Sequence, residues 1–176
     1  MQTPHPAVVR PFLPPLLILL LLVAGCQRGP RWDRRIEAAT PGEWAGWQRS
    51  NQESFSRAEW QEIEDACQDL KVRIIALREA TGADAVNEAL RAKIQGRTVR
   101  EVLALAGEAR LWRLNVERGE LEKMIAGNAT LRTKPGDTES AAYLLRKARE
   151  QQEKLEKVKA EIRATEDRLA GLAARA

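Results

Sequence analysis

A heptad pattern near the end of the chain constrains the fold more than any other feature of the sequence. Between Ala141 and Leu172, positions spaced alternately by three and four residues are mostly apolar, and Glu, Lys and Arg fill the other positions. Such a stripe is typical of a long helix that packs lengthwise against another helix. The stripe consists of Ala141, Leu144, Ala148, Gln151, Leu155, Val158, Ile162, Thr165, Leu169 and Leu172.

A second long helix is predicted directly before it. Thr98-Val99-Arg100-Glu101 has the pattern of a capping box, which begins a helix, and an apolar stripe continues through Val102, Leu105, Ala109, Trp112 and Val116 before drifting to Leu114, Leu121 and Ile125. Thr133-Lys134-Pro135-Gly136-Asp137 then suits a type II turn, with Asp137 placed to cap the next helix. Residues 97–176 are therefore predicted to form an antiparallel helical hairpin with its turn near 133–137.

Shorter helices are predicted over residues 40–96. Thr40-Pro41-Gly42-Glu43 and Ser56-Arg57-Ala58-Glu59 both have the pattern of helix starts. The second helix carries Trp60, Ile63, Cys67, Leu70, Ile74 and Leu77, and Thr81-Gly82 is expected to stop it. A third helix begins at Ala83 or Asp84, carries Val86, Leu90 and Ile94, and ends at Gly96.

The fold class is predicted from these patterns and from the composition. Aromatic residues make up 5% of the chain, Ala, Leu, Glu, Arg and Lys are abundant, and no alternating strand of useful length is present. We expect an all-α protein: a small helical bundle with a long antiparallel, coiled-coil-like C-terminal hairpin. Residues 40–176 are expected to form one domain.

The first 26 residues carry an export signal rather than a membrane-spanning helix. The apolar run Leu16–Val23 is shorter than the roughly 20 residues that a span needs, and Pro14 and Pro15 interrupt its front edge. Val23-Ala24-Gly25-Cys26 resembles the lipobox of bacterial lipoproteins, with Val in place of the commoner Leu at the first position. The resemblance implies that residues 1–25 are a signal peptide and that the Cys26 sulfur takes a diacylglyceryl group. The alternative is a conventional secretory signal followed by an ordinary cysteine.

The resemblance also implies a location. A protein with two or three acyl chains is anchored to a membrane but does not span it, and this one would face the periplasm. Gln27 lacks the aspartate that typically retains lipoproteins in the inner membrane, so the outer membrane is favoured in a Gram-negative host. Residues 26–39 are basic around Trp32 and are expected to form a membrane-proximal tether; a merely solvated linker is equally compatible.

Catalytic chemistry and nucleic-acid binding are not expected. Removal of residues 1–25 takes away the single histidine, His5, and one of the 29 basic residues, which lowers the net charge from +4 to +3. Histidine-based nucleophilic pairs and metal sites are then excluded, and the carboxylate pairs lie among Lys and Arg as solvated faces do. We expect no catalytic residue, metal site or cofactor. Both charge signs are interspersed, unlike the basic face of a nucleic-acid binder.

Cys67 has two open interpretations. With Cys26 assigned to lipid, Cys67 has no partner within the chain. Because it lies on an apolar stripe between Ile63 and Leu70, it is expected to be buried as a small hydrophobe. An intermolecular disulfide is the alternative.

The expected function is a non-catalytic one. The chain is interpreted as a lipid-anchored cell-envelope protein that serves as a structural or protein-interaction module, with a protein partner or with itself. The alternative is an accessory or inhibitor module that binds an envelope enzyme or transport complex. The candidate partner contacts are Trp44 and Trp47, which share one helix face and for which packing against the next helix is the favoured alternative, and Lys134 and Asp137 on the hairpin tip.

Overall fold

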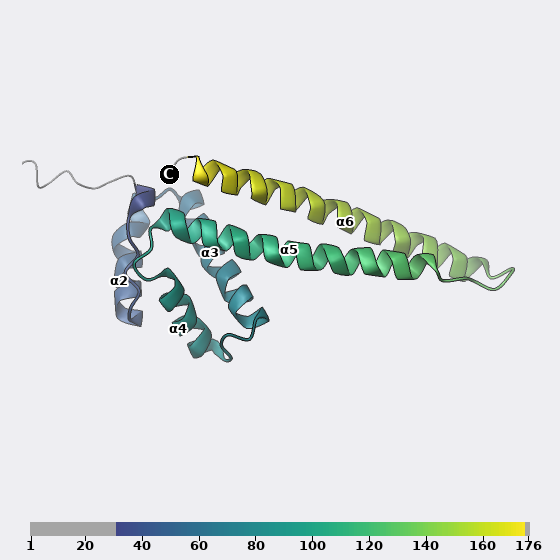
Figure 1. Ribbon diagram of the computed structural model, residues 1–176, viewed down its shortest axis with the longest axis horizontal. Helices are drawn as coiled ribbons and strands as arrows, with labels where there is room; N and C mark the ends of the chain where they lie inside the picture. Colours follow the sequence, from purple (N-terminus) through teal and green to yellow (C-terminus); the bar gives the residue numbers. More distant parts are fainter. Residues whose placement is uncertain (1–30, 175–176) are drawn as a thin grey trace, which may run out of the picture.

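The computed structural model describes residues 31–174, and every regular element in that range is helical. A head and a hairpin make up the molecule (Figure 1). The head contains the first elements and the beginning of α5, and the hairpin consists of α5 and α6, which run antiparallel away from the head. The elements are the 3-10 helix η1 (Arg31–Asp33), α2 (Pro41–Asn51), the 3-10 helix η2 (Gln52–Ser54), α3 (Arg57–Ala76), α4 (Ala83–Ile94), α5 (Val99–Ala129) and α6 (Thr138–Ala173). The predicted all-α hairpin fold is confirmed.

Three helices begin at the predicted capping boxes. Thr40, Ser56 and Thr98 each accept a hydrogen bond from the backbone N–H of the glutamate three residues later, and each glutamate side chain accepts one from the cap's own N–H. Each box therefore satisfies two N–H groups that a helix start leaves without a partner.

The hairpin turn also has the predicted geometry. Gly136 has φ +86, which a type II turn requires at its third position, and the Asp137 N–H donates to the Lys134 carbonyl at 3.1 Å. The Asp137 carboxylate then accepts from the Ser140 N–H at 3.0 Å and caps α6. The chain thus reverses and restarts a helix within a few residues.

The end of α3 differs from the prediction. The helix ends at Ala76, and Arg78 takes a left-handed conformation with φ 55. The Arg78 N–H donates to the Ile75 carbonyl and the Glu79 N–H donates to the Ile74 carbonyl, both at 3.0 Å, which is the Schellman pattern. The expected stop at Thr81-Gly82 is wrong, because Gly82 instead precedes α4 as its N-cap with φ +87.

The head has a continuous core formed by α2, α3, α4 and the beginning of α5. Ile63, Ile74, Ile94, Val99 and Val102 are the most deeply buried of its helical side chains. A row of aromatic rings extends this core toward α2: Trp44 stacks on Trp47, and Trp47 on Trp60, with ring centroids 5.4 and 6.2 Å apart.

The hairpin has a second, smaller core in the predicted register of α6. Leu155, Val158 and Ile162 of the heptad stripe pack against Leu114 and Leu121 of α5. The drift of the α5 stripe to Leu114 and Leu121 is confirmed. The expected continuation of the α5 stripe to Val116 is wrong, since that side chain is 45% exposed. An α-helix with about 3.6 residues per turn drifts against a strict heptad, so this position turns away from α6.

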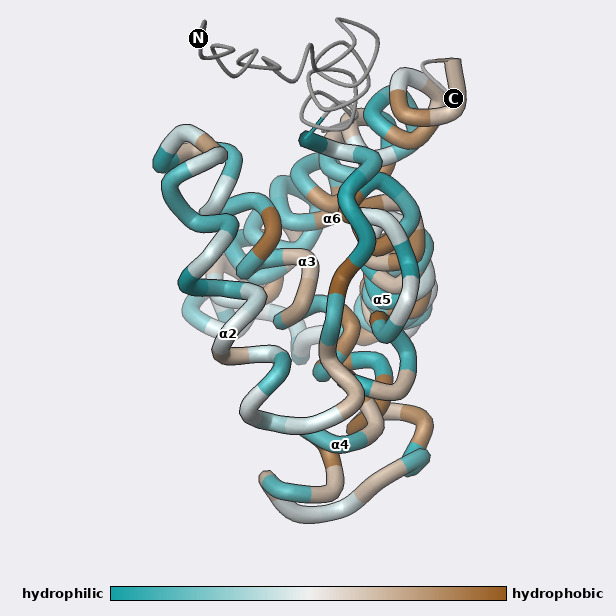
Figure 2. Tube along the Cα trace, turned by 90° about the vertical axis from the view of Figure 1, so that its left-hand side faces the viewer, coloured by the Kyte–Doolittle hydropathy of each residue, from teal (hydrophilic) through white to brown (hydrophobic). Residues whose placement is uncertain are grey.

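The segment before α2 is not a free tether from residue 31 onward. Ile36 and Ala38 are fully buried. Ile36 exchanges backbone hydrogen bonds with Gly96 and Arg97 at 2.9 and 2.8 Å, in the turn between α4 and α5. Figure 2 shows the segment running along the head between α2 and α5. The boundary expected at residue 39 is therefore wrong, and residues 31–39 are a strap that belongs to the head.

Candidate interaction surface

The predicted lipidation site is at residues that the structure does not describe. Cys26 and the other lipobox residues, Val23, Ala24 and Gly25, lie outside residues 31–174. Within the described range, no helix combines the length and the apolar character needed to cross a membrane.

The two tryptophans of α2 have different environments. Trp47 is buried, and its indole N–H donates to the Arg35 carbonyl at 2.8 Å. Trp44 is partly buried and stacks on Trp47. The pair therefore holds α2 and the strap onto α3. The buried ring of Trp47 is not available to a partner, and that of Trp44 is only partly accessible.

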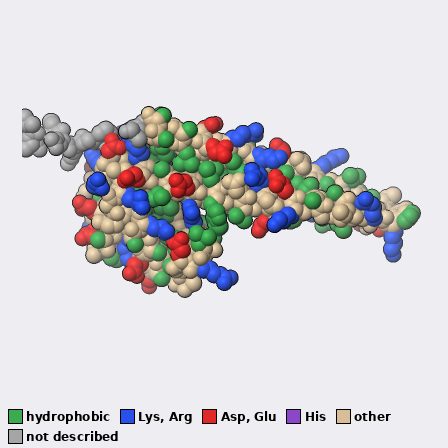
Figure 3. Space-filling model, viewed as in Figure 1, with side chains coloured by type: hydrophobic (Ala, Val, Ile, Leu, Met, Phe, Trp, Pro, Cys, Tyr) green, Lys and Arg blue, Asp and Glu red, His purple; other side chains and the backbone are tan. Residues whose placement is uncertain are grey.

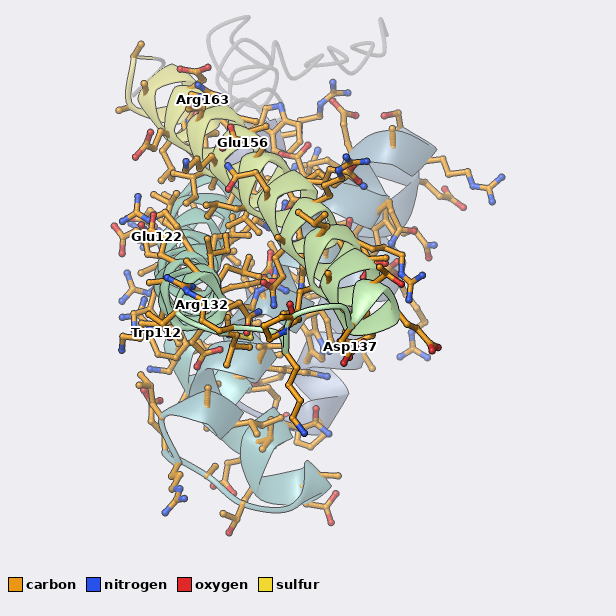
Figure 4. The ribbon with its side chains drawn as sticks, turned by 90° about the vertical axis from the view of Figure 1, so that its right-hand side faces the viewer. Trp112, Glu122, Arg132, Asp137, Glu156 and Arg163 are labelled. Atoms are coloured by element: carbon orange, nitrogen blue, oxygen red, sulfur yellow. The ribbon has the colours of Figure 1, made fainter. Side chains whose placement is uncertain are left out.

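The turn between α5 and α6 lies at the far end of the molecule from the head (Figure 1), and it carries Lys134 and Asp137. Figure 4 labels Asp137 where this turn meets α6. Both residues are exposed. The hydrogen bond from the Ser140 backbone N–H lowers the pKa of the Asp137 carboxyl, as expected for a carboxylate that caps a helix. Asp137 thus has a structural task, whereas the exposed Lys134 side chain is accessible for contact.

Cys67 is buried in the head, and that interpretation is confirmed. Desolvation raises the pKa of its thiol to about 11. A thiol that is both neutral and covered reacts slowly, so Cys67 acts as a core residue.

A groove of about 670 Å³ lies where α3 and α6 diverge over α5. Its floor is apolar, with Leu103, Ala106, Leu169 and Leu172, and four acidic and two basic side chains line it. Gly107 allows α6 to approach here, since a Cβ at that position would lie 2.6 Å from Leu169 Cδ2. The charged lining residues are Glu62, Asp65, Asp69, Glu161, Arg110 and Arg168.

Ion pairs hold the walls of the groove in place. Asp69 of α3 binds two guanidinium groups of α5, Arg110 at 2.7 Å and Arg113 at 3.4 Å. Glu62 of α3 pairs with Arg168 of α6. Asp65 and Glu161 have no basic partner among the ion pairs of the described residues, so the groove retains unneutralised negative charge.

The distal part of the hairpin, residues 122–150, lacks a core of its own. None of its side chains is buried, and Met124, Leu131, Tyr143 and Leu145 are 47 to 64% exposed. Its seam is closed by a polar contact, in which the Asn128 amide donates to Gln151 at 2.8 Å. Sequence reasoning missed Tyr143 because it lies off the heptad stripe; the only signal was that it is the single tyrosine.

No group of three His, Cys, Asp or Glu side chains is placed to hold a metal ion in the described part of the chain. The carboxylates with lowered pKa values include Glu59 and Glu101, which complete capping boxes, and Asp137, which is a helix cap. Charged side chains of both signs alternate along the hairpin (Figure 3).

In comparisons with known proteins, no family model, no curated protein and no solved structure matches this chain.

Proposed function

We propose that the protein is a lipid-anchored, non-catalytic interaction module of the cell envelope, and that its hairpin is the element that binds. Cys26 would carry the lipid, and the head would hold the hairpin relative to the membrane. The strap supports this arrangement, because it fixes the chain to the head from residue 31 onward, only five residues after Cys26.

The observation that carries the proposal is the unpartnered surface of the hairpin. α5 and α6 contain 31 and 36 residues, which corresponds to roughly 46 and 54 Å of helix. A hairpin that served only to complete the head would end where its buried contacts end. This one continues through residues 122–150, which contain no fully buried side chain and expose four large apolar ones. Apolar surface left at the end of an extended element is typical of a protein contact.

The anchor and the interaction are tested separately. Replacing Cys26 with Ser should move the protein from the membrane fraction to the soluble fraction, and a variant still retained in membranes would disprove the anchor. Crosslinking in intact cells, followed by purification and mass spectrometry, should capture a specific protein through the hairpin. A variant with Tyr143 and Leu145 changed to Ser should lose that capture, because it removes exposed apolar contact surface from the hairpin. Since both side chains are exposed, the fold should be unchanged.

The captured protein also decides between the two functional interpretations. An envelope enzyme or transport complex would favour the accessory or inhibitor role, whereas the same chain or a structural component would favour the structural role. Capture that is unaffected by the Tyr143 and Leu145 changes would place the contact elsewhere and contradict the proposal for the hairpin.

A further inference from the structure

One exposed face of α6 carries a stripe of side chains separate from the heptad stripe that packs on α5. Its residues recur every three or four positions, so they share one side of the helix. The first half of this α6 stripe is Glu139, Tyr143, Arg146 and Glu150, and the second half is Lys157, Glu161, Ala164 and Arg168, all of them exposed. Glu161, Ala164 and Arg168 also line the groove, so the second half of the stripe borders it.

The two halves of this stripe are complementary when α6 is laid antiparallel to a copy of itself. With the point between Glu153 and Lys154 as the centre, Arg146 lies opposite Glu161, and Glu150 lies opposite Lys157. In the same register Glu139 meets Arg168, and Tyr143 meets Ala164. Three pairs are of opposite charge, and the fourth places the large aromatic ring against the smallest side chain of the stripe.

We infer that the hairpin binds a second copy of this chain, with the two α6 helices antiparallel across a two-fold axis between Glu153 and Lys154. The inference rests on the proposed function and names the partner of the same surface. Isologous contacts of this kind repeat every favourable pair twice and close the assembly as a dimer.

The groove gives the partner's Tyr143 a place to bind. Tyr143 is 48% exposed. Within its own chain the Arg146 Cζ atom lies over its ring, 5.6 Å from the ring centroid. In the antiparallel register, the ring lies beside Ala164 of the second copy, at the wall of the groove whose floor is Leu169 and Leu172. The distal part of each hairpin, residues 122–150, thereby covers the groove of the other copy.

The two regions that meet in this register have complementary net charges. The distal part, residues 122–150, has six basic and four acidic side chains, whereas the groove has four acidic and two basic ones. The opposite net charges attract one another.

Charge reversal at one predicted pair tests this assembly. In the soluble Cys26→Ser protein, Arg146→Glu places two carboxylates opposite each other twice in each dimer, and Glu161→Arg does the same with two guanidinium groups. Each variant alone should weaken dimerisation about tenfold or more in sedimentation equilibrium. An equimolar mixture of the two variants should restore it. In the mixed dimer one chain has carboxylates at positions 146 and 161 and the other has guanidinium groups at both, so both contacts pair opposite charges. Added salt should weaken the unchanged dimer.

The matched control is Arg163→Glu. Arg163 is exposed on the same helix (Figure 4) and lies two residues, or roughly 200°, around the helix from Glu161. It makes the same charge change outside the stripe and should leave dimerisation within twofold of the unchanged protein. Circular dichroism should show all three variants folded, since no buried side chain is altered.

The possible outcomes separate this inference from the proposed function. A protein that is monomeric at 100 micromolar, or a mixture that fails to restore the dimer, would overturn the antiparallel pairing. The crosslinking experiment could still find a different partner, in which case the interaction module stands without the dimer. Restored association in the mixture is the supporting result, because only contact between two copies explains rescue across two chains.

Discussion

Replacing Ile36 with Ala tests whether residues 31–39 are part of the head. The side chain is fully buried in the head core, and the Ile36 backbone is hydrogen-bonded to the turn that joins α4 to α5. The change removes three carbon atoms, and at roughly 0.8 kcal/mol for each the lost transfer free energy is about 2.4 kcal/mol. The remaining cavity raises the expected loss of unfolding free energy to about 3 to 4 kcal/mol. For a domain of this size, the melting temperature should fall by roughly 10 °C.

Urea unfolding of the Cys26→Ser protein, followed by tryptophan fluorescence, measures this loss. Four of the five tryptophans, Trp32, Trp44, Trp47 and Trp60, contribute to the head core, so the signal reports the part of the protein that the strap stabilises. The control is Glu37→Ala, because Glu37 is exposed beside Ile36 and its loss should change the unfolding free energy by less than about 0.5 kcal/mol. A loss below about 1 kcal/mol for Ile36→Ala would refute the strap and return the segment to a tether.

Further expected outcomes concern other positions, each measured on the soluble Cys26→Ser protein. Arg78→Gly should stabilise the head by roughly 1 kcal/mol in urea unfolding, because Arg78 has φ 55 and glycine adopts that conformation without the Cβ clash; no gain would contradict it. Gly119→Ala should add up to about 1 kcal/mol in helix propensity, and Gly107→Ala should add less, since only the methyl at 107 meets Leu169; equal gains would argue against the close contact. Cys67 should react with iodoacetamide about 100-fold or more slowly in the folded protein than in urea, because burial raises its pKa from 9.0 to about 11; equal rates would show an accessible thiol. The Thr98 backbone hydrogen bond lowers the pKa of Glu101 below 4.5. The ionised Glu101 carboxylate therefore stabilises the folded protein above about pH 4.5, and this stabilisation is lost as the pH falls through the lowered pKa of the folded state. Glu101→Gln should accordingly make the melting temperature less sensitive to acid.

The features predicted correctly from sequence are those completed by neighbouring residues. A capping box needs a hydroxyl and a glutamate three positions apart, and the Pro135-Gly136 turn needs two adjacent residues, so tertiary contacts change neither. The end of α3 is the informative exception. Its left-handed position is normally filled by glycine, and the nearest glycine, Gly82, lies four residues further on. Arg78 adopts the left-handed conformation although its Cβ makes it unfavourable. The sequence signal, a glycine after the helix, therefore pointed to Gly82 and not to Arg78.

The features missed from sequence depend on contacts between distant segments. Ile36 and Ala38 stand in a stretch whose arginines suggest a solvated linker, and their burial is set by the α4–α5 turn some 60 residues away in sequence. For the candidate site, the sequence singled out Trp44 and Trp47 but could not show that the Arg35 carbonyl engages the Trp47 indole. It could not single out Tyr143 either, because whether a residue off the heptad stripe can contact a partner depends on which face of the helix stays exposed after the hairpin has packed.

The strap also limits how an anchored molecule can sit on its membrane. Five residue steps separate Cys26 from Arg31, and a fully extended chain spans about 18 Å over that length. If Cys26 carries the lipid, the head must therefore lie close to the bilayer surface. In the antiparallel dimer the two heads are at opposite ends, so both anchors reach one bilayer only when the hairpins lie along it. A short tether and a two-fold axis between Glu153 and Lys154 thus favour a dimer that lies flat on the membrane. A fluorophore on an exposed site such as Lys134 should then be quenched by labelled lipid headgroups in the unchanged protein, and less so in Arg146→Glu, whose hairpin is released from the pair.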